Sequence, residues 1–156
     1  MANELSGRAA LRCIAELLDL PDDDVLRALG GGWSPIELGS PGHVDLHWPP
    51  ATWFVSGEPM QVLLGVAGPT LTLARVVLRW DGPATASVHA TEEREFARED
   101  VLHQPDLVAG TVDEMALRSR RSFRWCRTCR TVNRPEHMHS RLLCMSCAAD
   151  HHGVRY

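Results

Sequence analysis

Four of the five cysteines in this 156-residue sequence lie near its C-terminal end, in two pairs that each enclose two residues. The spacing is Cys126-x2-Cys129-x14-Cys144-x2-Cys147. Two intervening residues let both sulfurs of a pair reach one metal ion from a tight turn, and two such turns supply the tetrahedral set of four sulfurs that Zn²⁺ accepts. We therefore predict that these four cysteines bind one Zn²⁺ ion.

The predicted zinc site is structural and not catalytic. Four protein ligands leave no open position at which the ion could bind water or a substrate. The segment that holds the cysteines, residues 125–156, is too short to bury enough apolar surface to fold unaided, so metal binding would supply the missing free energy of folding. The expected cofactor is one structural Zn²⁺ ion.

Two other interpretations of the cysteines remain open. Histidine is also a zinc ligand, so a site of three cysteines and one histidine would leave one cysteine free. The histidines in or beside the segment are His137, His139, His151 and His152. The remaining alternative is that the cysteines never meet around a metal ion.

The same segment resembles zinc fingers of the zinc-ribbon and treble-clef class. The residues that carry the resemblance are WCRTC at 125–129 and LLCMSCAADHHG at 142–153. In a treble clef the second cysteine pair begins a helix, so the resemblance implies a helix from Cys144 with Gly153 as its C-cap. It covers about a fifth of the 156 residues and implies nothing about a partner.

A second resemblance supplies an enzymatic alternative. The segment PEHMHSRLLCMSC, at 135–147, is similar to zinc-finger nucleases of the phage recombination-endonuclease type. Those proteins place an Asp-His-x-His element before a Leu-Leu-Cys-x-x-Cys pair, and their histidines serve as general base and metal ligand. His137 and His139 match this element, whereas Glu136 and Ala148 replace its Asp and a common Asn, and the gap to the second pair is short. The alternative function is a metal-dependent hydrolase or nuclease that uses the two histidines.

Two further groups of side chains could do chemistry. His43, Asp45 and His47 would project from one face of a strand, either as metal or acid–base groups or as the polar face of a half-covered strand. Cys13 lies on the apolar face of a predicted helix and is expected to pack there and not to act as a nucleophile. No glycine-rich phosphate loop or Gly-x-Ser-x-Gly elbow is present. We name no catalytic residue and expect a non-enzymatic protein.

Charge is distributed unevenly along the chain. The formal net charge is −4, yet residues 1–117 contain seven arginines against eighteen acidic residues, a balance of −11. Residues 118–156 contain nine arginines against two acidic residues, a balance of +7. We predict an acidic domain over 1–117 and an arginine-rich zinc-binding module over 118–156.

The arginines of the module and the neighbouring Trp125 form a candidate contact surface. Guanidinium groups bind phosphates and tryptophan stacks on bases, so nucleic acid is one candidate partner. The other is an acidic surface, on a partner protein or on this chain, and the isoelectric point of about 6.0 favours it. The predicted contact residues are Arg120, Arg121, Arg124, Trp125, Arg127 and Arg130.

The elements that must position these residues are predicted from the spacing of apolar side chains. Helical spacing predicts helices within residues 4–29, and alternation predicts an antiparallel sheet within residues 43–90. Helical patterns return within residues 91–120, where Thr91 is expected to cap one helix and Pro105 to open another. The predicted strands cover residues 43–48, 53–56, 60–67, 71–80 and 85–90. The predicted fold class is α+β, with the zinc module at the C-terminal end.

The location of the protein is predicted from what its sequence lacks. The start has no basic stretch followed by an apolar run, and no apolar stretch approaches the roughly 20 residues that span a bilayer. Paired Cys-x-x-Cys units are metal ligands in a reducing compartment. We expect a cytoplasmic interaction or regulatory protein without membrane contact, whose zinc module contacts a protein partner or nucleic acid.

Overall fold

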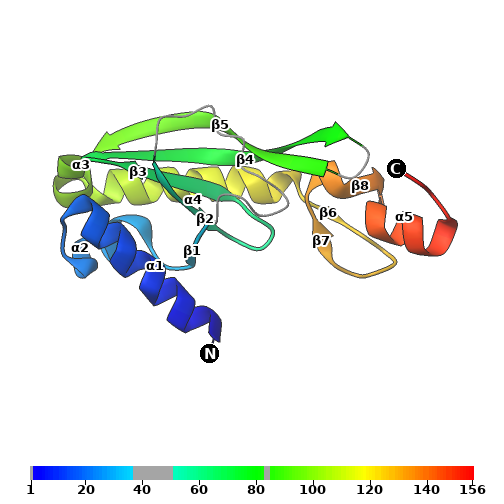
Figure 1. The fold of residues 1–156 in the computed structure, drawn as a ribbon, viewed down its shortest axis with the longest axis horizontal. Coiled ribbons are helices and arrows are strands. Elements are labelled where there is room, and N and C mark those ends of the chain that lie inside the picture. Colours follow the sequence, from blue (N-terminus) through cyan, green and yellow to red (C-terminus); the bar gives the residue numbers. More distant parts are fainter. Residues whose placement is uncertain (1, 37–50, 83–84) are drawn as a thin grey trace.

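The computed structural model describes residues 2–36, 51–82 and 85–156. Within these residues five strands form one antiparallel sheet in the order β1-β2-β3-β4-β5. The strands are β1 (Trp33–Pro35), β2 (Thr52–Ser56), β3 (Val62–Ala67), β4 (Thr70–Gly82) and β5 (Thr85–Ala97). The long β4 and β5 extend across the molecule, and helices cover one face of the sheet (Figure 1). The predicted α+β fold class is confirmed.

Four helices pack on that face of the sheet. They are α1 (Ala2–Leu18), α2 (Asp22–Leu29), α3 (Arg98–His103) and α4 (Pro105–Ser122). The main hydrophobic core lies between these helices and the sheet, where Ile14, Phe54 and Leu64 are at most 1% exposed. Complete burial of such a side chain contributes about 1.5–3 kcal/mol. None of the helices in the described part of the chain is long and apolar enough to cross a membrane.

Strand β3 is buried on both faces. Val62, Leu64 and Val66 belong to the core beneath the helices, whereas Leu63 belongs to a second apolar cluster on the opposite face. Both neighbours of β3 are strands, so its whole backbone is paired within the sheet. This explains why residues 62–66 are almost entirely apolar where an exposed strand would alternate.

The helix predicted from Thr91 is wrong over most of its length. Strand β5 continues to Ala97, and α3 begins only at Arg98. Phe96 lies opposite Leu71 of β4 and is buried in the main core. Pairing with β4 therefore outweighs the helix preference of the charged residues, whose exposed side chains are compatible with the edge position of β5 in the described sheet.

A β-bulge in β5 directs Glu92 toward α4. Thr91 pairs with Arg75 and Arg94 with Leu73, so two residues of β5 lie opposite one residue of β4, and Glu92 takes a φ of 54°. The Glu92 carboxylate accepts hydrogen bonds from Arg75 Nη1 at 2.9 Å and from Arg118 Nη1 at 3.1 Å. The bulge thus connects the sheet to α4 through the Glu92–Arg118 ion pair, while Arg75 of β4 pairs with the same carboxylate.

The structure can be compared with three further predictions, which concern Cys13, Pro105 and the strand at 43–48. Cys13 is partly buried and packs against the main core, as expected for a structural cysteine. Pro105 opens α4 as predicted. The predicted strand at 43–48, with His43, Asp45 and His47, lies outside the described residues.

Beyond α4 the chain forms short elements, which we call the cysteine module (residues 124–156). They are β6 (Arg124–Trp125), β7 (Val132–Asn133), the 3₁₀-helix η1 (Pro135–His137), β8 (Met138–Ser140), β9 (Leu143–Cys144) and α5 (Met145–His152). β6 pairs with β7, and β8 with β9, in two small antiparallel hairpins. The module lies at one end of the molecule, and α1 and α2 lie toward the other end (Figure 1). The predicted domain boundary at 117/118 falls inside α4.

Candidate metal centre

The sulfurs of the four paired cysteines converge. Cys126 and Cys129 lie in the turn between β6 and β7, Cys144 ends β9, and Cys147 lies in the first turn of α5. Their Sγ atoms are all within 4.8 Å of one another. The predicted convergence is confirmed, and no histidine of the described residues belongs to this cluster.

Backbone hydrogen bonds bring the two pairs together. The N–H of Cys126 donates to the carbonyl of Thr131 at 3.0 Å, and the N–H of Arg130 donates to the carbonyl of Cys126 at 2.9 Å, which closes the first turn. The N–H of Arg127 donates to the carbonyl of Leu142 at 2.9 Å, so the turn is attached to the hairpin that carries the second pair.

The second pair is positioned by the start of a helix. Cys144 is the N-cap of α5, and its Sγ accepts a hydrogen bond from the N–H of Cys147 at 3.5 Å. The helix ends at His152, and Gly153 follows in the left-handed conformation with a φ of 65°. The predicted helix and its glycine C-cap are confirmed. The N–H of Cys147, at the positive N-terminal end of the helix, stabilises the thiolate form of Cys144 against the opposing effect of burial.

The distance between two of the sulfurs matches that expected around a tetrahedral metal ion. A zinc ion with Zn–S bonds of about 2.3 Å holds its sulfurs roughly 3.8 Å apart. The Sγ atoms of Cys129 and Cys144 are 3.9 Å apart. Cys126 Sγ also accepts a hydrogen bond from the N–H of Cys144 at 3.4 Å, a contact that stabilises a thiolate. The four side chains therefore form a donor set that could hold one metal ion.

The electrostatics of the cluster also favour a cation. Hydrogen bonds from the backbone N–H groups of Cys129 and Cys144 lower the pKa of Cys126 to about 6. Burial raises the pKa of the Cys144 thiol, and burial together with the neighbouring sulfurs raises the pKa of Cys147 to about 12. Four adjacent thiolates are thus unfavourable alone, and a divalent ion between them would supply the missing positive charge.

An ion pair that no pattern in the sequence indicates attaches the cysteine module to the sheet. The side chain of Arg134 is 5% exposed, and its Nη2 donates to Glu136 Oε1 at 3.1 Å. The same guanidinium donates to the carbonyls of Val76, at 2.6 Å, and Met60. Glu136 Oε1 also accepts from the N–H of Leu78 at 3.3 Å. The pair thereby binds three backbone groups of the part of the molecule that holds β1–β5 and α1–α4, which we call the body (described residues up to 122).

The end of β3 explains why these backbone groups are available. The pairing of β3 with β4 begins at Val62, which lies opposite Arg75. From Val76 onward the edge of β4 that faces away from β5 has no neighbouring strand in the described sheet. The ion pair takes the place of a strand along this edge. In the sequence Arg134 is one arginine among many, so only the position of β4 could identify its role.

The histidines of the nuclease alternative make other contacts. The ring of His137 lies against Trp80, with centroids 5.8 Å apart, and burial lowers the pKa of His137. The Nδ1 of His139 is hydrogen-bonded to the hydroxyl of Tyr156 at 2.7 Å. His151 and His152 are exposed at the end of α5. None of the four belongs to a cluster of potential metal ligands in the described part of the chain.

Some predicted contact arginines have partners within the chain. Arg120 Nη1 donates to Gln61 Oε1 at 3.0 Å. Arg124 Nη1 donates to carbonyls at the C-terminal end of α4, including that of Ser122 at 2.8 Å. Arg118, beside the predicted set, pairs with Glu92 and Glu114. Part of the hydrogen-bonding capacity of these guanidinium groups is therefore used within the chain.

The remaining predicted contact residues are open to solvent. Arg121, Arg127 and Arg130 are exposed, and the described residues provide no side-chain partner for them. Trp125 is 50% exposed, and its cross-strand neighbour Val132 is 48% exposed. Arg141 is also exposed and without a partner in the same part of the chain. The positive and apolar groups around the first cysteine pair are thus accessible to another molecule.

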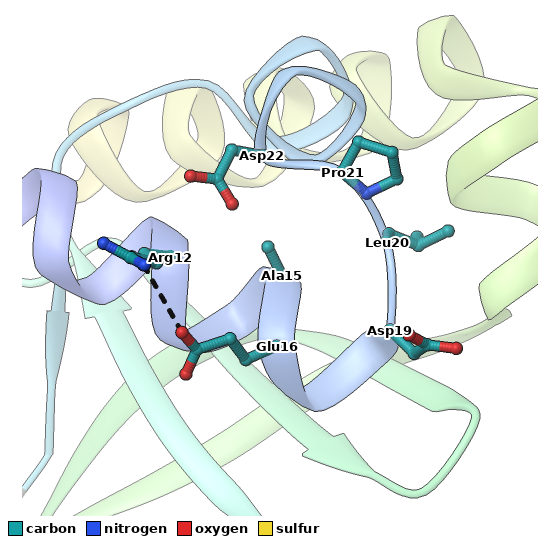
Figure 2. Close-up of a pocket in the computed structure, with 7 residues that line it drawn as sticks. All are labelled: Arg12, Ala15, Glu16, Asp19, Leu20, Pro21 and Asp22. Carbon is teal, nitrogen blue, oxygen red and sulfur yellow. Dashed lines mark ion pairs between the residues drawn. The ribbon is translucent and has the colours of Figure 1, made fainter.

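A pocket of about 500 Å³ lies at the corner between α1 and α2. Arg12 and Glu16 form an exposed ion pair on α1, and Asp22 lies across from them at the start of α2 (Figure 2). The corner is remote from the cysteine module (Figure 1). Its groups are solvated surface charges, so it adds nothing to the metal centre.

Comparison of the chain with models of protein families, with curated proteins and with solved structures finds no match. The metal centre and the surface around it therefore carry the functional interpretation.

Proposed function

We propose that this chain is a non-enzymatic interaction or regulatory protein in which one structural Zn²⁺ orders a treble-clef-type module. The module would present an arginine-rich surface to an acidic macromolecule. The observation that carries the proposal is that Arg127, Arg130 and Arg141 stay exposed and unpaired within the described residues, although the chain is acidic overall.

The donor set supports zinc as the metal. Four thiolates in a tetrahedral arrangement suit Zn²⁺ or an iron–sulfur centre among the common metals, and a single ion fits sulfurs 3.9 Å apart. The first pair comes from a turn between two short strands and the second from the start of a helix, with a hairpin between them. This order of elements supports a treble clef, and the thiolates suit the reducing conditions of the cytoplasm.

The chemistry of a closed site supports binding over catalysis. Four sulfur ligands leave the zinc ion no free coordination position, so it would order the module and activate no water. His137 and His139 contact Trp80 and Tyr156 and meet no metal cluster of the described residues. We therefore assign no catalytic step to either histidine.

Contacts within the chain account for only part of the positive charge. Arg118, Arg120 and Arg134 have partners in the body or beside it. The acidic residues of the cysteine module are Glu136, which pairs with Arg134, and Asp150. The arginines around the first cysteine pair keep their charge for an external partner, and charge complementarity selects an acidic one.

A zinc assay and a binding assay together test the proposal. Freshly purified, reduced protein should contain one equivalent of zinc by elemental analysis. The zinc-loaded protein should be retained on immobilised heparin, a polyanion, and released as salt rises from about 50 to about 200 mM. Removal of zinc by a chelator should abolish retention, because the module loses its order.

Paired arginine variants provide the control. Arg127→Gln with Arg141→Gln should elute at lower salt than the natural protein. Arg8→Gln with Arg27→Gln removes the same charge from exposed positions of the body and should elute close to the natural protein. Substoichiometric zinc, or equal retention with and without the metal, would refute the proposed function.

A further inference from the structure

We infer that the acidic partner is a single-stranded nucleic acid, which binds the surface formed by Trp125, Arg127 and Arg130. We call these three residues the stacking surface. A base would stack on the indole of Trp125, and phosphates would pair with the two guanidinium groups. The inference rests on the proposed function, because the metal must order the module before these residues come together.

The backbone of Arg130 is the first observation that supports this surface. Arg130 has a φ of 56°, a left-handed conformation that glycine adopts without steric cost and other residues seldom adopt. The turn requires this conformation, since the N–H of Arg130 donates to the carbonyl of Cys126 at 2.9 Å. Glycine would therefore suit the position better on structural grounds.

No interaction of the Arg130 side chain with the described residues explains why this position holds an arginine. It is exposed, and the described residues offer it no hydrogen-bond or ion-pair partner. A residue that adopts a disfavoured backbone conformation, and whose side chain forms no hydrogen bond or ion pair with the described residues, points to a contact outside the chain. The charge of the guanidinium and its place beside the first cysteine pair specify an anionic group.

Among the four tryptophans that the structure describes, Trp125 differs from the others. The indole Nε1 of Trp33 donates to Leu29 O at 3.2 Å, and that of Trp80 donates to Glu136 O at 2.9 Å. Trp53 is 6% exposed and packs against the backbone of Gly65. Trp125 is 50% exposed, and its Nε1 has no partner in the part of the chain that the structure describes. Its ring is therefore free to stack on another planar group.

The size and charge of the surface favour a flexible strand over a folded protein. A stable interface with a folded protein buries about 800 Å² on each side. The stacking surface belongs to a hairpin with two residues in each strand, which projects at the end of the molecule (Figure 1). Residues 124–133 contain three arginines and no acidic residue. A single strand is flexible enough to bend around this small hairpin, so that a base can contact Trp125 while phosphates contact the arginines.

The test measures the affinity of the full zinc-loaded chain for a labelled oligothymidine of about ten nucleotides by fluorescence anisotropy. Trp125→Thr should weaken binding by about fivefold or more, since one stacked base is lost. Arg130→Gly should weaken binding about fivefold and make the slope of log affinity against log salt shallower by about 0.7, as expected for one phosphate contact.

Arg130→Gly separates binding from folding. Glycine relieves the left-handed backbone, so zinc content should stay at one equivalent and the unfolding temperature should be unchanged or higher. Arg8→Gln, which removes one exposed charge from α1, should bind oligothymidine like the natural protein. Zinc content is measured for each variant, and Arg130→Gly decides the matter if Trp125→Thr loses its metal.

The outcomes distinguish this inference from the proposed function. Retention on heparin without oligothymidine binding at low salt would overturn the inference and leave the proposed function in place. Tighter binding of polyglutamate than of oligothymidine would assign the surface to an acidic protein and overturn it as well. Unchanged oligothymidine affinity in Trp125→Thr and Arg130→Gly would also overturn the inference. If the zinc-loaded protein is not retained on heparin, both the proposed function and this inference are refuted.

Discussion

The body of the molecule and the cysteine module bury very different kinds of side chain. Between its sheet and helices the body buries large apolar side chains such as Phe54, Leu64 and Leu71, each at most 1% exposed. The buried cluster of the module consists of three cysteines, against which two partly buried residues pack. These are Cys126, Cys144, Cys147, Met138 and Leu143. Apolar burial can therefore stabilise the body, whereas the module needs another source of free energy.

This difference shows how a small appendage can be ordered without a core of its own. A metal ion would join its two hairpins and helix, and the ion pair of Arg134 and Glu136 fixes the result to the open edge of β4. The two regions should then respond independently to changes in their interiors and jointly to changes at their contact. The following predictions separate these cases.

The largest effect is expected from loss of the metal. Cys144→Ser should abolish stoichiometric zinc binding, because three sulfurs hold the ion much less tightly than four. Structural zinc contributes about 10–16 kcal/mol to the folding of small zinc domains, so residues 124–156 should lose their order. Hydrogen exchange followed by mass spectrometry should show fast exchange in these residues and retained protection in β3 and β4.

Leu64→Ala is the matched change in the body. Its cavity should destabilise the body by about 2–5 kcal/mol in chemical denaturation, while the folded protein keeps one equivalent of zinc. Retained protection of residues 124–156 in Cys144→Ser would show that the module does not depend on its metal.

The next effect concerns the contact between the two regions. Arg134→Ala should destabilise the protein by about 3 kcal/mol, because the partly buried carboxylate of Glu136 and the carbonyl of Val76 would both lose the guanidinium. Zinc should remain bound, and the amide of Leu78 should exchange faster. Arg141→Ala removes an exposed arginine of the same module and should change stability by less than about 0.5 kcal/mol. Equal stability of the two variants would exclude a docking role for Arg134.

A smaller effect tests the tight packing of the body. A Cβ atom added to Gly65 would overlap the ring of Trp53, so Gly65→Ala should destabilise the protein by about 1–3 kcal/mol. Gly110 lies on α4 with no atom of another element near its missing side chain, and Gly110→Ala should stabilise it by about 0.5–1 kcal/mol. Thermal unfolding measures both, and neither should alter zinc content. The prediction fails if Gly65→Ala and Gly110→Ala change the stability in the same direction.

The smallest effect is a dependence on pH at the contact. Burial against Trp80 lowers the pKa of His137 below its ordinary value of about 6.5, so the folded state favours the neutral ring. Its contribution to stability is therefore present above pH 6.5 and is lost as the pH falls below this value. Denaturation at a series of pH values should show this loss. His137→Gln should remove the part of the pH dependence of stability that comes from this ring. An NMR titration that gives a pKa above the ordinary value would contradict the assignment.

The sequence alone was sufficient for features whose causes are local. The spacing of the cysteine pairs predicted their convergence, because two residues between ligands set the reach of each turn. Pro105 and Gly153 marked the start of α4 and the end of α5, since each has a strong conformational preference of its own. The alternation of apolar residues likewise predicted most of β4.

Tertiary structure decided the features that depend on distant partners. Residues 91–97 have a helical pattern, but pairing with β4 and burial of Phe96 make them a strand. Arg134 and Glu136 look like solvated charges in the sequence, yet they occupy the edge of β4 that the end of β3 leaves open. Neither outcome could be predicted locally, because its free energy comes from hydrogen bonds and burial against residues that lie far away in the chain.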